Sequence, residues 1–553
     1  MRVTLLAAIA AALAFPGSAL AHHGHGFHGH RGNDVKRIVV IYEENHSFDN
    51  LYGSWEGVNG LANAGSHATQ VNQAGTPYTC LKQDDVNLAT PPLPATCHDA
   101  TVTPPFDSAF PNAPFTIDDY IGPMDTTCPQ PGTNPNNGNG ARKGEGLPGG
   151  CTRDLVHRFY QEQYQLNGGK QNRYVTGSDA IGLTMGYYDT KALPIYKYLH
   201  APGHPRYAIA DDFFQSAFGG SFLNHQWLIA AKTPVFPGAA ADQHSVLDAN
   251  GMPTSYPLYT ATGTVADTAL TQACPATNGL ACGDYAVNTI QPTYQPFSSP
   301  TALKLPPQTA PTIGDRLSAK GIDWAWYSGG WSNANGDVGA PGWTNGNGPT
   351  CSDPNAATGA TFPNCPDKLF QYHHQPLNYY ASFAPGTAMR RDHLRDEDEF
   401  ESAATASKRH CQLKPVSIIK PIGAENEHPG YASEHNGSDH LVDLLSSIQN
   451  SRCAKDTMVI VTYDEFGGQW DHVSPPGMGS RGPHDQWGPS TRIPALVLSP
   501  RLRGDFVVDH TSHDTTSILA TIEHRFGLRP LTSRDASVRD MFSVFSARGP
   551  HTR

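Results

Sequence analysis

The stretch KRIVVIYE at residues 36–43 runs directly into the polar segment ENHSFD at residues 44–49. Its β-branched and aromatic side chains predict a buried strand. A second stretch has the same pattern, because TMVIVTY at residues 457–463 is followed at once by DEFGG at residues 464–468. In an open α/β sheet, ligands bind beyond the carboxyl ends of the strands. We therefore expect the two acidic segments to meet at one edge of one sheet.

Strands and helices alternate along the rest of the chain. Further strands are predicted at residues 207–210, 324–331, 416–419 and 495–499, and helices at residues 155–166, 221–231, 440–449 and 514–526. The alternation favours an α/β sandwich with a largely parallel sheet. Between these elements lie loop-rich stretches at residues 57–150, 233–300 and 335–370. We expect these stretches to be insertions in a single catalytic domain that spans residues 36–553.

The first 21 residues predict an exported protein. Arg2 precedes an apolar run at residues 4–15, and residues 19–21 form a small-x-small cleavage site, as in a secretory signal peptide. The mature protein is therefore expected in the periplasm or outside the cell, where disulfides persist. The chain has 10 cysteines and no CxxC pair. We expect five local bridges, which would join residues 80–97, 128–151, 274–282, 351–365 and 411–453.

The composition disfavours several kinds of partner. The chain has 38 Lys and Arg against 50 Asp and Glu, a net charge of −12 without a basic stripe, so no nucleic-acid partner is expected. Beyond the signal peptide, no stretch approaches about 18 apolar residues, so no transmembrane segment is expected. No feature indicates an obligate protein partner. Residues 22–35 are interpreted as a His-rich flexible tail, with weak metal capture as the alternative.

Hard oxygen donors follow the predicted strands. They are carboxylates, one carboxamide and one hydroxyl: Glu44, Asn45, Asp464, Glu465 and Ser221. Such donors suit one divalent metal ion, of an identity that the sequence leaves open. The ion would hold a phosphate oxygen and lower the pKa of an attacking group. The alternative is that the acidic residues are surface turns or helix caps.

Ser221 follows two glycines at a predicted helix start. Glycine lets the backbone approach a ligand closely, and free N–H groups at a helix start bind phosphate. Ser221 is therefore a candidate nucleophile, with a simple helix cap as the alternative. Histidines can bind phosphate oxygens or protonate a leaving alkoxide, although each can also be structural. Four histidines stand out by their context: His157, His373, His374 and His428.

Two longer segments resemble the signatures of a known family. ENHSFDNLYG at residues 44–53 resembles the ENxSFDxxxG signature of the bacterial phosphoesterase family, which includes phospholipases C and acid phosphatases of the A type. YDEFGGQWDHV at residues 463–473 resembles the second signature of that family. RIPALVLSP at residues 492–500 and DTTSIL at residues 514–519 fit as well. The matches follow the family's order over residues 37–530.

The resemblance implies an alkaline-phosphatase-like, three-layer α/β/α fold and a metal-assisted phosphoric ester hydrolase. The implied metal ligands are Glu44, Asn45, Ser221, Asp464 and Glu465. Ser221 would also be the nucleophile, and His428 is the first choice to protonate the leaving oxygen. Glu465 stands where some members have a second Asp, so its direct ligation is left open. The implied phosphate-binding histidines are His157, His373 and His374.

The nucleophile region separates two branches of this family. Phospholipase C members have a region similar to a Thr followed by Gly-Pro-Asn-Arg, whereas this chain has GGSFLNHQ at residues 219–226. We therefore expect an acid phosphatase that acts on small phosphate monoesters. The alternative is a phospholipase C that acts on a phospholipid head group. A sulfatase is disfavoured because no CxPxR-like segment is present, and a secreted metal-binding protein without catalysis would leave both signatures unexplained.

Overall fold

The computed structural model describes residues 34–82, 94–119, 152–239 and 285–549. The predicted signal peptide, the histidines of the predicted tail, and the predicted bridges 128–151 and 274–282 lie outside these residues. The other three predicted bridges are confirmed, because they join Cys80 to Cys97, Cys351 to Cys365 and Cys411 to Cys453.

An eight-stranded sheet forms the centre of the molecule. In spatial order its strands are β11 (Leu394–Asp396), β10 (Trp324–Ser328), β12 (Val416–Lys420), β1 (Arg37–Glu43), β13 (Thr457–Tyr463), β14 (Ala495–Leu498), β8 (Tyr207–Ala210) and β15 (Phe506–Asp509). Strand β14 runs antiparallel to both of its neighbours, and the remaining pairs are parallel. The predicted, largely parallel sheet is therefore confirmed.

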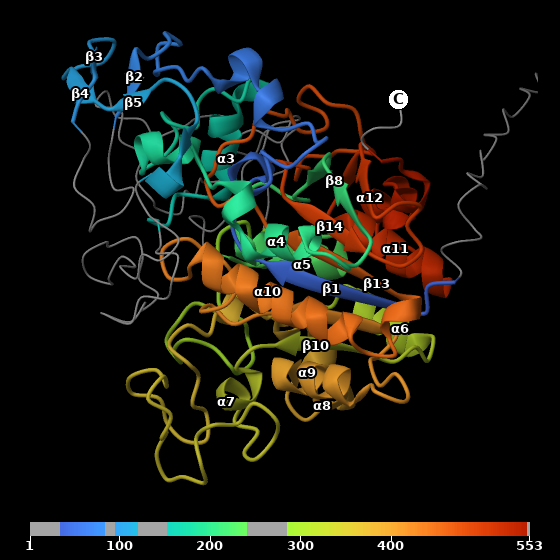
Figure 1. Ribbon diagram of the computed structural model, residues 1–553. Coiled ribbons are helices and arrows are strands. Elements are labelled where there is room, and N and C mark those ends of the chain that lie inside the picture. The colour runs from blue at the N-terminus through green and yellow to red at the C-terminus, as the bar shows by residue number, and fades with distance from the viewer. Residues whose placement is uncertain (1–33, 83–93, 120–151, 240–284, 550–553) are drawn as a thin grey trace, which may run out of the picture.

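The helices form two groups, one on each face of the sheet. In one group, α10 (Glu434–Gln449) contacts α4 (Pro194–His200) and α9 (Glu397–Ala406). In the other, α5 (Ser221–Ala230) contacts α6 (Ile313–Ala319) and α11 (Thr516–Phe526). Figure 1 shows β1 in the middle of the molecule, with α10 running alongside it. This arrangement is the predicted α/β/α sandwich.

Shorter elements surround these layers. The remaining helices are α2 (Phe48–Leu51), α3 (Phe159–Leu166), α7 (Trp331–Asn335), α8 (Ala388–His393) and α12 (Ser533–Ser537). Pairs of short strands are β2 (Cys80–Leu81) with β5 (Phe110–Pro111), β3 (Cys97–Asp99) with β4 (Phe106–Ser108), β6 (Phe115–Thr116) with β7 (Gly186–Tyr187), and β9 (Phe213–Phe214) with β16 (His513–Asp514). Within the described residues, no helix is long and apolar enough to cross a membrane. The single catalytic domain stays a prediction.

Several predicted boundaries are displaced. The strand predicted at residues 324–331 ends at Ser328, because Gly330 has a φ of 74° that ends the extended run before α7. Helix α10 begins earlier than predicted, where the Ser433 side chain accepts a hydrogen bond from Asn436 N and caps it. Helix α3 begins later than predicted, because Arg158 is extended.

A fully buried arginine joins the segments that follow β1 and β13. The Arg492 guanidinium lies 3.1 Å from Asp49 Oδ1 and donates a 3.1 Å hydrogen bond to Asp471 Oδ1. It also lies over the Phe48 ring. Asp471 accepts a further hydrogen bond from the Asp49 main-chain N–H. The two segments are thus held together by charges that water does not reach.

Replacement of this arginine should destabilise the fold. In Arg492→Met, Asp49 and Asp471 stay buried without their counter-charge, and we expect the free energy of unfolding to fall by about 3–5 kcal/mol. Urea denaturation followed by circular dichroism measures the change. The control is Arg501→Met, because the pair of Arg501 with Asp34 is 3.6 Å long and partly exposed, so its loss should cost less than about 1 kcal/mol. Equal stabilities of the two variants would contradict the prediction.

Candidate active site

The register of β1 against β13 places the two acidic segments side by side. Glu43 pairs with Tyr463, so Glu44 and Asp464 leave the sheet together at the carboxyl ends of adjacent parallel strands. The Asn45 main-chain N–H donates to Asp464 Oδ1 at 3.0 Å, across 419 positions of sequence. Asn45 has a φ of 60°, and asparagine tolerates this left-handed conformation better than most residues. The predicted meeting of the two segments is confirmed.

Oxygen atoms from three segments converge on the Ser221 hydroxyl. Ser221 is the first residue of α5 and is 4% exposed. Its Oγ lies 3.0 Å from Glu44 Oε2, 3.3 Å from Asn45 Oδ1 and 3.5 Å from Glu465 Oε1. Asp464 belongs to the same buried cluster, and Asp464 Oδ2 accepts no hydrogen bond from the described residues. The structure therefore brings together all five side chains that the sequence predicts as metal ligands.

The buried carboxylates of this cluster need a positive charge to offset their mutual repulsion. Burial raises the pKa of Glu44 well above its usual range, and the Asp464 carboxylate raises it further. The pKa of Glu465 is raised by the same two causes, and burial also raises the pKa of Asp464. Three close, buried carboxylates with a carboxamide and a hydroxyl are a donor set for a hard divalent ion. The residues present thus fit such an ion, which would offset their mutual repulsion.

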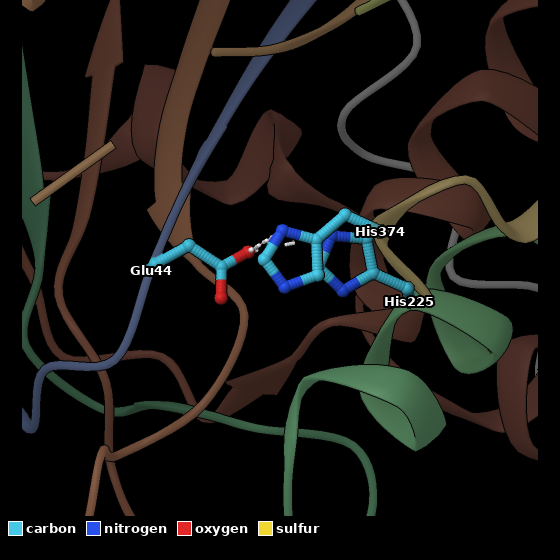
Figure 2. A group of neighbouring side chains, drawn as sticks. All are labelled: Glu44, His225 and His374. Atoms are coloured by element: carbon cyan, nitrogen blue, oxygen red, sulfur yellow. Dashed lines mark ion pairs between the residues drawn. The ribbon is translucent and has the colours of Figure 1, made fainter. Parts of the chain in front are cut away.

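The second oxygen of Glu44 lies close to one lysine and two buried histidines. Glu44 Oε1 lies 3.0 Å from Lys420 Nζ. It also lies 3.5 Å from His225 Nε2 and 3.4 Å from His374 Nδ1, and Figure 2 shows these two rings beside Glu44. The two imidazole rings are stacked, with centroids 4.8 Å apart and planes 6° from parallel. Glu44, His225 and His374 are also close enough to hold a metal ion, although two parallel, stacked rings are a poor pair of ligands for one ion. Lys420 is the charged partner of Glu44 Oε1, while Glu44 Oε2 faces Ser221.

A cavity of about 210 Å³ opens beside Ser221. Its wall includes His157, Arg158, His373, His428 and Tyr431. Burial lowers the pKa of His373 to about 3 and that of His428 well below its usual range, and His157 adds to both shifts. These two histidines are therefore neutral before a ligand binds. His428 Nδ1 donates to the Pro429 carbonyl at 2.6 Å, so His428 Nε2 faces Asn45 Nδ2, at 2.8 Å, as an acceptor.

This arrangement agrees with the comparisons to known proteins. A profile of the phosphoesterase family matches residues 35–529 of the chain. The chain belongs to the phosphoesterase family. It is accordingly a hydrolase that acts on phosphoric ester bonds, as the two signatures at residues 44–53 and 463–473 predicted.

Named relatives of this phosphoesterase are phospholipases C. The chain is 24% identical over 546 residues to phospholipase C B of Mycobacterium tuberculosis (strain H37Rv), a match that covers 94% of this chain and 78% of that protein. It is 27% identical over 204 residues to non-specific phospholipase C6 of Arabidopsis thaliana, covering 32% of this chain and 36% of that protein. The match to the mycobacterial protein covers both signatures, because nearly the whole chain is aligned.

Solved structures resemble the phosphoesterase only distantly. A protein of the alkaline phosphatase superfamily from Vibrio parahaemolyticus has a TM-score of 0.29 and 11% identity, and the match covers 63% of each chain. A 2-O GAG sulfatase has a TM-score of 0.29 and 12% identity, covering 67% of this chain and 72% of that one. The evidence for the fold is therefore the strand order and the helical layers described above.

The structure places one predicted histidine elsewhere than expected. His157, His373 and His428 line the cavity. His374 instead lies 3.4 Å from Glu44 Oε1, where it is 2% exposed and stacks on His225. The physical reason is that His373 and His374 are adjacent in a short helical turn, so their side chains point in different directions.

Two residues of this site were missed from the sequence. His225 lies four positions after Ser221, so both occupy the same face of α5, and His225 Nδ1 donates to the Ser221 carbonyl at 2.8 Å. Lys420 is the last residue of β12, which is a parallel neighbour of β1. The helical spacing and the strand end were the signals that could have identified them.

Removal of one carboxylate should weaken metal binding by the phosphoesterase. Asp464→Asn removes a buried charge from the oxygen cluster, and we expect the affinity for a divalent ion to fall by at least about tenfold, the loss that follows removal of even a supporting group. Metal content after dialysis, measured by mass spectrometry, checks this. The control is Glu425→Gln, which alters a separate cluster with Glu397 and His440. Loss of metal from the control alone would place the ion in that other cluster.

Proposed function

We propose that the protein is an exported phosphatase that hydrolyses phosphate monoesters through a phosphoserine at Ser221. The observation that carries this proposal is the convergence of Glu44, Asn45 and Glu465 oxygens on Ser221 Oγ at the floor of a small, histidine-lined cavity. The predicted signal peptide and the three disulfides support export, because disulfides persist in oxidising compartments. One divalent ion would be held by Glu44, Asn45, Ser221, Asp464 and Glu465.

The attack step follows from the surroundings of Ser221. A bound divalent ion would supply charge neutralisation for the phosphate and a lower pKa for the hydroxyl. The Ser221 hydroxyl donates to Glu44 Oε2, so its proton leaves toward the carboxylates as Oγ attacks phosphorus. The Oγ–P bond forms while the bond from phosphorus to the leaving oxygen breaks in line with it. The free N–H groups at the start of α5 stabilise the negative phosphoryl oxygens.

His428 is placed to protonate the leaving oxygen. It lines the cavity above Ser221, and the carbonyl of Pro429 fixes which of its ring nitrogens faces the site. His428 is neutral before a ligand binds, and a bound phosphate dianion beside it would raise its pKa, because a nearby negative charge favours the imidazolium form. His428 then takes up a proton from solvent at Nε2, as an imidazolium, and passes it from Nε2 to the leaving alkoxide. Water releases inorganic phosphate from Ser221 in the second half of the reaction.

The charges of the cavity wall favour monoesters. A monoester carries up to two negative charges on its free oxygens, whereas a diester carries one. His157, Arg158, His373 and His428 lie on the wall, and Asp154 is the one carboxylate among the described residues that line it. The buried histidines are neutral in the empty cavity and can gain protons when a dianion binds, so together with Arg158 they can balance its two charges. The similarity to phospholipase C B favours a second candidate, a phospholipase C that cleaves the diester of a phospholipid head group.

Loss of the nucleophile should abolish turnover. For Ser221→Ala, assayed with excess divalent ion, we expect kcat to fall by at least about 10⁴-fold while the fold persists, because removal of a covalent nucleophile has costs of this order. The assay compares 4-nitrophenyl phosphate with 4-nitrophenyl phosphorylcholine at pH 5 to 8. A higher kcat/KM for the monoester supports the phosphatase, and a higher value for the diester supports the phospholipase C. Near-wild-type turnover by Ser221→Ala would contradict both.

Loss of the proton donor should depend on the leaving group. For His428→Asn we expect kcat to fall by about 10²-fold or more with glycerol 2-phosphate, since general acids contribute about 10²–10⁴-fold. With 4-nitrophenyl phosphate the loss should be much smaller, because nitrophenolate leaves without a proton. The matched control is His373→Asn, which lines the same cavity and should slow both substrates by the same factor. Equal losses for both substrates in His428→Asn would exclude the proposed role.

A further inference from the structure

A buried carboxylate joins the nucleophile loop to the rest of the site. Glu162 lies in α3, five residues after His157, and is 0% exposed. Glu162 Oε2 accepts a 2.6 Å hydrogen bond from the Gly219 main-chain N–H, two residues before Ser221. Gly219 has a φ of 88°, and a Cβ there would lie 2.5 Å from the Phe159 nitrogen. The nucleophile loop therefore lies directly against the start of α3.

Gln215 extends this connection to the metal segment. Its Nε2 donates to Glu162 Oε2 at 3.1 Å and to the carbonyls of Ala217 and Gly219. Its Oε1 accepts from the Phe466 main-chain N–H at 3.0 Å, one residue after Glu465. Glu162 and Gln215 thus link the segments that carry His157, Ser221 and Glu465.

The two oxygens of Glu162 serve different partners. Oε2 accepts from Gly219 and Gln215, on the nucleophile side. Oε1 accepts from the Ser490 hydroxyl and from the hydroxyl and the main-chain N–H of Thr491. All five partners donate to Glu162, as they would to an ionised carboxylate, which offers only acceptors. Burial raises the pKa of Glu162 to about 7, so the carboxyl is ionised above that pH. A carboxamide at this place would set its own N–H groups against one of the two sets of donors.

We propose that Glu162 is a positioning residue that holds Ser221 in line for attack on phosphorus. It does so through the Gly219 N–H and not through contact with the substrate, since Glu162 is not among the described residues that line the cavity. The inference rests on the proposed phosphoserine mechanism. It predicts that the rate of phosphoserine formation depends on Glu162, whereas metal binding and substrate affinity depend on it weakly.

The test uses rapid-quench kinetics of the full-length protein with a labelled phosphate monoester. The burst amplitude counts the functional molecules, and the burst rate reports the attack by Ser221. For Glu162→Gln we expect the burst rate to fall by about 10–100-fold, as for a small misplacement of a reacting group. KM and the metal content should stay within about threefold of wild type. Ser490→Ala is the matched control, because it removes a donor to Oε1 only, and its burst rate should stay within about threefold of wild type.

The outcomes separate this inference from the proposed function. A wild-type protein that cleaves the substrate without phosphoserine would overturn both. A wild-type burst with an unchanged burst rate in Glu162→Gln would overturn the positioning role alone, even if the variant is less stable. If Glu162→Gln does not fold, Glu162→Asp replaces it, since it keeps the charge but withdraws the carboxylate from Gly219. A slower burst in Glu162→Asp then supports the role, and an unchanged burst overturns it.

Discussion

The parallel pairing of β1 with β13 is the constraint on which the site depends. Its register sets Glu43 opposite Tyr463, and the next residues of both strands are then forced to leave the sheet at the same height. Each strand end contributes oxygen donors, so a slip of one residue would turn half of them to the other face of the sheet. Arg492 fixes the same pair of segments a few residues later. The backbone pairing of β1 with β13 and the buried ion pairs of Arg492 thus stabilise the same arrangement of the two segments.

The site concentrates negative charge on buried carboxylates. Glu44, Asp464 and Glu465 are all removed from water, and Lys420 compensates only one side of the group. Lys420 pairs with Glu44 Oε1, whereas Glu44 Oε2 faces Ser221, so the two oxygens of one carboxylate have different partners. The neutral histidines of the cavity complete this pattern, because they can gain positive charge when a phosphate arrives.

The sequence predicted the central strands and the five oxygen donors because both leave local signals. Apolar runs such as residues 37–43 and 457–463 have few alternatives to a buried strand. Strands β11 and β15 were missed because they are short and contain charged residues, and their pairing is decided by neighbours far along the chain. Lys420 and Glu162 were missed for a similar reason. A buried charged residue is recognised by what surrounds it, and no local pattern records that Glu162 meets Gly219 and Thr491.

The long-range origin of the site also bears on when the protein becomes active. Its oxygen donors come from the beginning, the middle and the last fifth of the chain, and Asn45 and Asp464 touch across 419 positions. A chain is made from its N-terminus, so Asp464 and Glu465 are added only after roughly four-fifths of the polypeptide. Molecules that end before residue 464 lack both carboxylates. The full oxygen cluster therefore forms late, when the C-terminal part of the chain joins the strand that was made first.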